Sequence, residues 1–176
     1  LLLHLGKYFR TNLQQSDTEV DFYKEIDNIK SYLEIEKARF KDKLNIIYDI
    51  PDNIDCKLPP LILQPLVENA VKHGILEKVE GGTVIIKARD KRKEIEIIIE
   101  DDGVGMEQAE IEYLLSTDNI ETNKIGIRNV NDRLKTKYGK DYRLRIKSKP
   151  NMGTTVRIAI PKYSRRFSQH AKSYSG

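Results

Sequence analysis

The sequence has a single cysteine, Cys56, among its 176 residues. One cysteine excludes an internal disulfide framework, and without a CxxC motif or a Cys/His cluster the chain offers no recognisable zinc site. A reducing cytosol is therefore the expected environment. The chain also lacks any apolar run near the roughly 18 to 20 residues that cross a bilayer, and it has no signal-peptide pattern. We therefore expect this chain to be soluble.

Methionine is also scarce, and none precedes Met106. Because the chain opens with LLLHL, we expect it to be a piece of a longer protein. The lack of a membrane segment here then says nothing about the parent protein.

The chain carries a net charge of +4 and has an isoelectric point near 9.0. Lysines and arginines are spread along the chain with acidic residues between them, and part of the excess lies in the serine-rich segment 162–176. We expect residues 162–176 to be a flexible tail. A basic nucleic-acid binder is an alternative that rests on the isoelectric point alone, and we expect no nucleic-acid partner.

Two common nucleotide-binding motifs are absent. There is no GxxxxGK[ST] loop, and GVG at 103–105 lacks the third glycine and the context of a dinucleotide-binding fold. The three histidines, at positions 4, 73 and 170, are too scattered to indicate a metal triad or a Ser-His-Asp site.

The apolar pattern nevertheless predicts a regular fold. Between Phe22 and Leu44 apolar residues recur every three, four or seven positions, which indicates a long amphipathic helix. Branched residues predict strands at 44–50, 83–89, 95–100, 143–148 and 154–160. Further helices are predicted at 59–73, 107–116 and 126–138, the first with a bend or late start at Pro65. This order predicts an α+β two-layer sandwich, with a mixed, mostly antiparallel sheet and helices on one face.

The stretch LVENAVKHG, residues 66–74, combines aliphatic and polar residues. On a helix, Glu68, Asn69, Lys72 and His73 lie three or four positions apart and share one side, while the aliphatic residues face the sheet. A polar binding site is one interpretation. A solvated ion pair on an amphipathic helix is the other.

Three further glycine-containing motifs follow in order: EDDGVGM at 100–106, KIGIRNV at 124–130 and NMGTTV at 151–156. The first places a carboxylate at a strand end beside backbone that a flat ligand can approach, because glycine has no side chain. The second opens a helix whose free amides can hold a phosphate. Taken singly, each is equally explained as a turn or a helix start.

Together, the motifs ENAVKHG, DDGVGM, GIRNV and GTTV resemble the N, G1, G2 and G3 boxes of the ATPase superfamily of gyrase, the heat-shock chaperones, histidine kinases and MutL. The flanking segments NIKSYLEIEKARFKDKL and PPLILQPLVENAVKHGI are similar to the LytS/YesM type of bacterial sensor histidine kinase. The resemblance covers residues 20–161, and four ordered motifs are far more specific than one. It implies the Bergerat-type ATPase fold and a protein-histidine kinase that uses ATP and Mg²⁺.

At the phosphate end, the resemblance implies that Asn69 ligates the Mg²⁺ bound to the ATP phosphates, because an amide oxygen suits this ion. Glu68 would orient a metal-bound water or assist proton transfer. Lys72 and His73 would reach the phosphates. We therefore expect these four residues to be the catalytic set.

At the adenine end, Asp101 would accept a hydrogen bond from the adenine amino group. Gly103 and Gly105 would let the base lie close to the backbone, and Thr154 would help to close this side. Asp102, often Asn in the family, is assigned no role.

The G2 box would complete the phosphate site. Gly126 would open the helix whose amides face the phosphates, with Arg128 and Asn129 nearby. The family usually has glycine where this chain has Lys124, and the lid 107–123 contains no glycine. Lys124 is a further candidate phosphate contact, supplying charge in place of the glycine.

The resemblance also implies three parts of the chain. Residues 1–43 would be the end of an upstream dimerisation domain with a linker helix, residues 44–161 the ATP-binding domain, and residues 162–176 the tail. His4 lacks the acidic neighbour of the family's phosphate acceptor, so we expect the acceptor histidine to lie outside this chain.

The parent protein is then expected to be a homodimer in the bacterial cell membrane, with this domain in the cytoplasm and a response regulator as partner. Two alternatives keep the fold: an ATP-binding regulatory module without phosphotransfer, and a serine kinase of the anti-sigma type.

Overall fold

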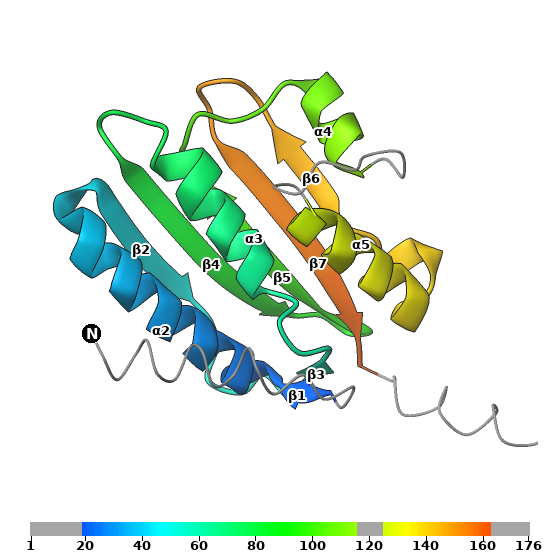
Figure 1. The fold of residues 1–176 in the computed structure, drawn as a ribbon. Helices are drawn as coiled ribbons and strands as arrows, with labels where there is room; N and C mark the ends of the chain where they lie inside the picture. Colours follow the sequence, from blue (N-terminus) through cyan, green and yellow to red (C-terminus); the bar gives the residue numbers. More distant parts are fainter. Residues whose placement is uncertain (1–18, 116–124, 163–176) are drawn as a thin grey trace, which may run out of the picture.

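A five-stranded sheet is the centre of the fold in the computed structural model, which describes residues 19–115 and 125–162 (Figure 1). The strand order from edge to edge is β2-β4-β5-β7-β6. The strands span Leu44–Asp49 (β2), Gly82–Asp90 (β4), Glu94–Asp101 (β5), Arg145–Ser148 (β6) and Thr154–Pro161 (β7). β2 and β4 are parallel and the other neighbours are antiparallel. A separate short ribbon pairs Val20–Asp21 (β1) with Lys57–Leu58 (β3).

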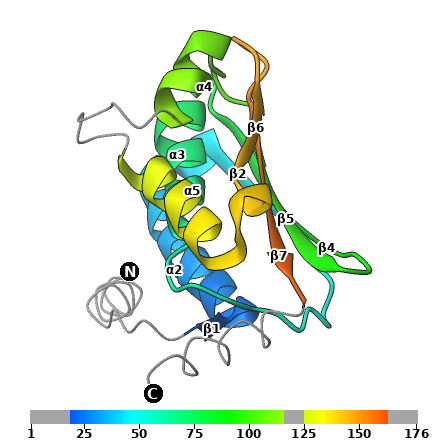
Figure 2. The ribbon, with the colours of Figure 1, turned by 90° about the vertical axis from the view of Figure 1, so that its right-hand side faces the viewer.

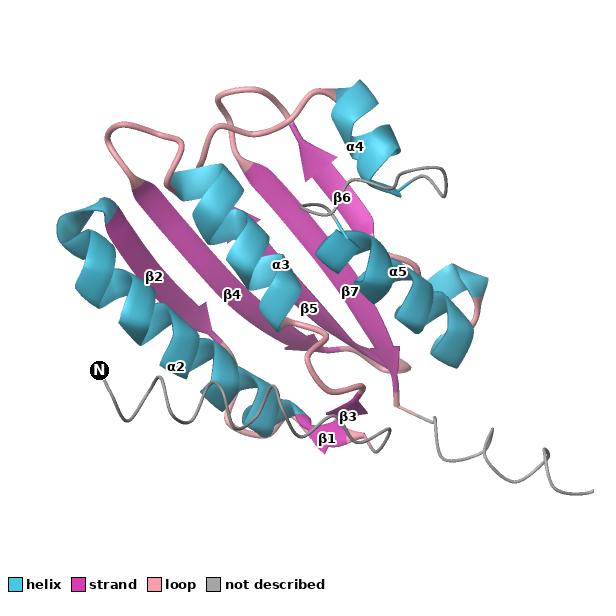
Figure 3. Ribbon diagram, viewed as in Figure 1, coloured by secondary structure: helices cyan, strands magenta, loops and turns pink. Residues whose placement is uncertain are grey.

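The helices lie on one face of this sheet (Figures 2 and 3). They span Phe22–Phe40 (α2), Gln64–Asn69 (α3), Gln108–Leu115 (α4) and Ile125–Tyr138 (α5). A π-helical segment, Ala70–Ile75, continues α3, and single 3₁₀ turns occupy Lys41–Lys43 and Lys140–Tyr142. The predicted α+β two-layer sandwich is therefore confirmed. Within the described ranges, no helix has the length and apolar character needed to cross a bilayer.

The hydrophobic core lies between the helices and the sheet. Along β4, Val84, Ile86 and Ala88 are fully buried against the helices, as the two-residue repeat of a strand requires. The amphipathic face of α2 enters the same core, with Ile29 and Leu33 completely buried. The division predicted at residue 43 remains a prediction, but α2 and the sheet share one core.

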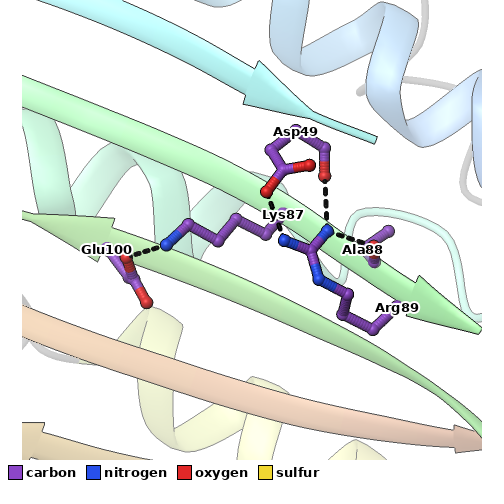
Figure 4. Close-up of polar contacts among 5 residues, drawn as sticks. All are labelled: Asp49, Lys87, Ala88, Arg89 and Glu100. Atoms are coloured by element: carbon purple, nitrogen blue, oxygen red, sulfur yellow. Dashed lines mark hydrogen bonds and ion pairs between the residues drawn. The ribbon is translucent and has the colours of Figure 1, made fainter. Parts of the chain in front are cut away.

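Charged side chains of neighbouring strands pair on the opposite face of the sheet. Lys87 on β4 donates to Glu100 on β5 at 2.5 Å. Arg89 binds the carboxylate of Asp49 on β2 and donates to the Asp49 carbonyl at 3.2 Å (Figure 4). Cross-strand pairs of this kind each contribute up to about 1 kcal/mol. They bridge neighbouring strands on the face away from the helices.

The helix predicted from residue 59 begins late, as Pro65 had indicated. α3 starts only at Gln64, because Leu61 adopts a left-handed backbone conformation with φ of 55°. A residue with positive φ cannot belong to a right-handed helix. The segment before α3 is therefore a loop whose backbone amides are not used by a helix.

Candidate functional site

The polar residues of LVENAVKHG lie on the solvent side of α3 and its π-helical continuation. Leu66, Val67, Ala70 and Val71 are buried against the sheet, whereas Glu68 and Asn69 are half-buried and Lys72 and His73 exposed. The segregation predicted from the helical spacing is therefore confirmed. The backbone bond from Leu76 N to Val71 O, at 2.9 Å, marks the wider π turn. Such turns occur often at functional sites.

Residues of this cluster make two side-chain contacts between positions four residues apart. The carboxylate of Glu68 accepts hydrogen bonds from Lys72 Nζ at 3.0 Å and from Gln64 Nε2 at 2.8 Å. His73 Nδ1 lies 3.2 Å from Glu77 Oε1. The pair Glu68–Lys72 is the surface ion pair that the sequence allowed as an alternative, so this contact alone does not separate the two interpretations.

A hollow of about 210 Å³ beside the cluster favours a binding site. Its lining consists of Pro65, Glu68, Asn69, Lys72, His73, Gly126 and Ile127. It lies where α3 faces the first turn of α5, and the two helices lie side by side on the sheet (Figure 1). Gly126 adds no side chain to this space. Residues of the N and G2 motifs, far apart in the sequence, thus meet around one hollow.

Asp101 lies at the end of β5 and is largely withdrawn from solvent. Its carboxylate accepts hydrogen bonds from the backbone amides of Gly103, at 3.0 Å, and Thr154. Burial raises the pKa of Asp101 to about 6, the two amides oppose this rise, and the charge of Asp102 adds to it. A carboxylate held in this way is an acceptor fixed in position.

Gly74 joins the two halves of the site, a role that sequence reasoning missed. A Cβ at Gly74 would lie 2.7 Å from Oδ1 of Asp101. Its carbonyl oxygen also accepts the amide of Val104 at 3.1 Å. The residue after His73 therefore packs directly on the carboxylate of the EDDGVGM motif. The glycine at position 74 is visible in the sequence, but a glycine there is equally expected at the end of a helix.

The glycines of the G1 motif allow backbone to pack on backbone. A Cβ at Gly103 would lie 2.2 Å from the carbonyl carbon of Gly74. Gly105 has φ of 68°, and a Cβ there would lie 2.0 Å from the carbonyl oxygen of Lys149. Asn151 N donates to Val104 O at 2.6 Å across the same contact. Both glycines thus have packing roles whether or not a ligand approaches them.

Replacing Gly103 by alanine should therefore destabilise the nucleotide-free protein. The added methyl group meets backbone atoms that cannot rotate away, and overpacking of this kind costs about 1 to 3 kcal/mol. Urea unfolding followed by circular dichroism measures the change. Gly126→Ala is the control, because Gly126 is helical and a Cβ there meets only the Cβ of Pro65, at 3.3 Å, so this substitution should cost less. Equal stability of Gly103→Ala and the wild type would contradict the packing role.

Ser148 is a second residue whose role sequence reasoning missed. Its hydroxyl donates to Gly153 O at 2.8 Å and accepts the amide of Met106 at 2.8 Å. Because its one proton is used, the hydroxyl of Thr154, 2.9 Å away, donates to it. Thr154 is itself buried. Ser148 therefore fixes Thr154 beside Asp101.

Asp102, to which the sequence assigned no role, fastens the loop to β4. Its Oδ1 accepts the amide of Thr83 at 2.7 Å, and Lys78 Nζ donates to its carbonyl at 3.0 Å. The side chain thus points at the start of β4 and serves the fold.

The remaining predicted residues belong to the G2 motif. Gly126 lies in the first turn of α5, and Arg128 pairs with Asp132 at 3.7 Å. Asn129 is exposed and lines a larger neighbouring hollow of about 680 Å³. Lys124 lies outside the described residues, as do residues 116–123 of the predicted lid.

The oxygen atoms at the hollow could bind Mg²⁺ only if a substrate phosphate supplied further ligands. Among the residues that the structure describes, no three His, Cys, Asp or Glu side chains gather to hold a metal by themselves. Asn69 offers one amide oxygen at the hollow, and the neighbouring Glu68 is held by Lys72 and Gln64. One protein oxygen combined with phosphates and waters is a usual Mg²⁺ environment.

The fold has known counterparts. The catalytic domain of histidine kinase ThkA, in a nucleotide-free form, matches with a TM-score of 0.61 and 18% sequence identity, covering 84% of this chain and 97% of that one. The histidine kinase domain of the blue-light activated histidine kinase from Erythrobacter litoralis matches with a TM-score of 0.54 and 16% identity, covering 75% of this chain and 58% of that one. At these identities the likeness shows the fold.

Relatives found by sequence have higher sequence identity to this chain than these two structures do. "Sensor histidine kinase YpdA" of Escherichia coli K12 is 39% identical over 162 residues, which is 92% of this chain and 28% of that protein. "Sensor protein LytS" of Bacillus anthracis is 33% identical over 179 aligned residues, which is 99% of this chain and 30% of that protein. The chain thus spans less than a third of the length of these two relatives.

Two family descriptions match the chain itself. Residues 1–44 match the family "Histidine kinase". Residues 57–164, which include all four glycine and asparagine motifs, match "Histidine kinase-, DNA gyrase B-, and HSP90-like ATPase". The chain therefore belongs to the histidine kinase-, DNA gyrase B- and HSP90-like ATPase family.

Proposed function

We propose that this chain is the ATP-binding catalytic domain of a two-component sensor histidine kinase. The observation that carries the proposal is the arrangement around Gly74. On one side lies the fixed carboxylate of Asp101, and on the other the polar hollow with Asn69 and Lys72. An acceptor for a base and a cationic site for phosphates are thus joined through one short backbone segment.

At the adenine end, the proposal gives each residue a limited task. Asp101 accepts the hydrogen bond of the adenine amino group, and the amides of Gly103 and Thr154 hold its carboxylate in place. Ser148 keeps Thr154 in position. Selectivity for adenine follows, because a base with a carbonyl group at that position would face the carboxylate with an acceptor.

At the phosphate end, the residues supply charge and hydrogen bonds. Asn69 would ligate Mg²⁺, which would neutralise phosphate charge when bound with the nucleotide. Lys72, His73 and Arg128 approach the phosphates, and the first turn of α5 at Gly126 offers free amides. Asn129 and Lys124 are further proposed contacts. Lys72, which pairs with Glu68 in this structure, would contact the phosphates either in place of Glu68 or together with it. Glu68 can also orient a water.

In the whole protein, the reaction would be transfer of the γ-phosphoryl group to a histidine of the dimerisation domain. The imidazole nitrogen forms a bond to phosphorus as the bond to the bridging oxygen of ADP breaks, and a neighbouring base accepts the imidazole proton. The domain contributes positioning and charge stabilisation. We further propose that the parent protein is a membrane-located homodimer that passes the phosphoryl group to a response regulator.

Two measurements test this proposal. This chain should bind Mg-ATP at least tenfold more tightly than Mg-GTP, as measured by isothermal titration calorimetry. The full-length protein incubated with γ-labelled ATP should become labelled on a histidine, giving a product that acid removes and base does not.

The outcomes separate the alternatives. Mg-ATP binding without labelling of the full-length protein would favour a regulatory module. An acid-stable label would favour a serine kinase. No preference for ATP, combined with salt-dependent DNA binding, would favour the nucleic-acid binder.

A further inference from the structure

Glu25 is a buried acidic residue that the proposed reaction does not use. It lies on α2, is 1% exposed and points at the loop before α3. Its Oε1 accepts the amide of Leu61 at 2.8 Å, and its Oε2 accepts those of Ile62 at 3.0 Å and Leu63 at 3.3 Å. Three successive backbone amides thus converge on one side chain.

The backbone of this loop is shaped for an anion. Pro59 and Pro60 have no amide hydrogen, so residues 61–63 supply the first free donors before α3. Leu61 has a positive φ, and Leu63 is in a right-handed conformation. The amides of residues 61–63 all donate to the Glu25 carboxylate, so the loop forms an anion-binding concavity. The strain at Leu61 therefore has a local reason, namely contact with the Glu25 carboxylate.

The contacts of Glu25 offset only part of the cost of burying its charge. Burial is the largest effect and leaves the pKa of Glu25 above its ordinary value, although the three amides and the nearby charge of Arg133 lower it. Only the ionised carboxylate can accept from all three amides without placing its own proton against a donor. A buried carboxylate with three charge-assisted hydrogen bonds is a firm connection between two segments.

Arg133 extends the connection to a third element. It lies on α5, and its Nη2 donates to Pro60 O at 2.8 Å. The loop 60–63 is therefore held from α2 by Glu25 and from α5 by Arg133. α3 begins at the next residue, Gln64, and carries Asn69 at its last position.

We propose that Glu25 is a positioning residue that sets the start of α3 and, with Arg133, couples the placement of α2 to the phosphate end of the nucleotide site. From Leu63 to Asn69 the helix rises only about 9 Å, so a shift at its start moves Asn69 directly. Asp101 is attached to β5 and is held by Gly103 and Thr154, which Glu25 does not contact. Asn69 lies on α3 itself, whereas Gly74 lies in the π-helical segment that follows. Gly74 packs on Asp101 and is also held by the amide of Val104. The coupling therefore acts more strongly on phosphate and metal binding than on adenine binding. This inference rests on the proposed ATP site.

The test compares Glu25→Gln with Glu34→Gln, an exposed glutamate on the same helix that undergoes the same charge change. The amide introduced by Glu25→Gln retains one acceptor oxygen and turns a donor toward the loop amides. Glu25→Gln should weaken Mg-ATP binding about tenfold at a temperature where the protein is fully folded. Its affinity for adenosine, followed by NMR titration, should stay within twofold of the wild type, and Glu34→Gln should change neither.

Two further measurements guard against a purely structural effect. Arg133→Gln, which removes the link to Pro60 without touching the core, should weaken Mg-ATP about threefold and also spare adenosine. Amide exchange at residues 66–69 should accelerate in Glu25→Gln without any nucleotide. Unchanged exchange there, or Mg-ATP affinities within twofold of the wild type in both folded variants, would overturn the inference. A wild-type protein that binds no Mg-ATP would overturn the proposed function, while accelerated exchange would still show the link from Glu25 to α3.

Discussion

Asp101→Asn should weaken ATP binding about a hundredfold and at the same time make the nucleotide-free protein more stable at pH 7. The loss of affinity follows from hydrogen-bond polarity. The amide of Gly103 donates to Oδ1, so this position keeps the carbonyl oxygen of the introduced asparagine, and the amino group takes the other position, which we propose faces the base. A donor then meets the donor of the adenine amino group, and an unpaired buried polar contact costs about 1 to 3 kcal/mol.

The gain in stability follows from the raised pKa of Asp101. Its pKa is about 6 in the folded protein, against an ordinary value of 3.8, so the fold favours the protonated form. The stabilisation from protonation is complete below about pH 4 and is lost as the pH rises to about 6. Above pH 6 the ionised carboxylate lowers the free energy of unfolding by an amount on the order of 1 to 3 kcal/mol. Asparagine has no such charge.

Urea unfolding at pH 5 and pH 7.5 measures this difference, and calorimetry measures ATP affinity. The stability advantage of Asp101→Asn should be larger at pH 7.5. Asp102→Asn is the matched control, because its side chain accepts from Thr83 and does not face the base. It should bind ATP within about threefold of the wild type. An Asp101→Asn variant that binds ATP normally would remove Asp101 from the adenine site.

Sequence reasoning predicted the elements that depend on local pattern. The segregation of Leu66 and Val67 from Glu68 and Asn69 follows from helical spacing alone, and the strands follow from runs of branched residues. The order of the four motifs then indicated which polar groups belong together. The structure places the N and G2 motifs around one hollow and the G1 and G3 motifs against each other.

The contacts that sequence reasoning missed all join distant segments. Glu25 resembles any other charged residue of an amphipathic helix, and only the loop folded beside it, 36 residues later, shows why it is buried. Ser148 has no local signature because its partners lie in two other segments. The late start of α3 likewise depends on the carboxylate of Glu25, which accepts the amide of Leu61. The sequence pattern predicts which face of an element is buried. It does not predict which polar side chain forms hydrogen bonds with backbone amides far away in the sequence.

Asn69→Ala should weaken Mg-ATP about a hundredfold and ATP in excess EDTA no more than threefold. The reason is that the amide oxygen is proposed to act through the metal, so its loss matters only when the metal is present. Stability should hardly change. Within the described part of the chain the Asn69 side chain has no hydrogen-bond partner, and alanine has the higher helix propensity.

Calorimetric titrations with and without Mg²⁺ provide the measurement, with Asn53→Ala, at an exposed asparagine away from both hollows, as the control. Equal losses with and without the ion would show that Asn69 contacts the nucleotide itself or only shapes the helix. Asp101→Asn should instead lose the same factor in both conditions, because the adenine contact does not involve the metal.

Combining Asn69→Ala with the other substitutions then separates direct contacts from positioning. Asp101 and Asn69 are proposed to act at opposite ends of the nucleotide, so their effects on the free energy of Mg-ATP binding should add. Glu25 acts through the placement of Asn69, so Glu25→Gln should cost little once Asn69 is already alanine. Full additivity of Glu25→Gln and Asn69→Ala would mean that Glu25 reaches the phosphates through α5 and Arg133, and not through α3.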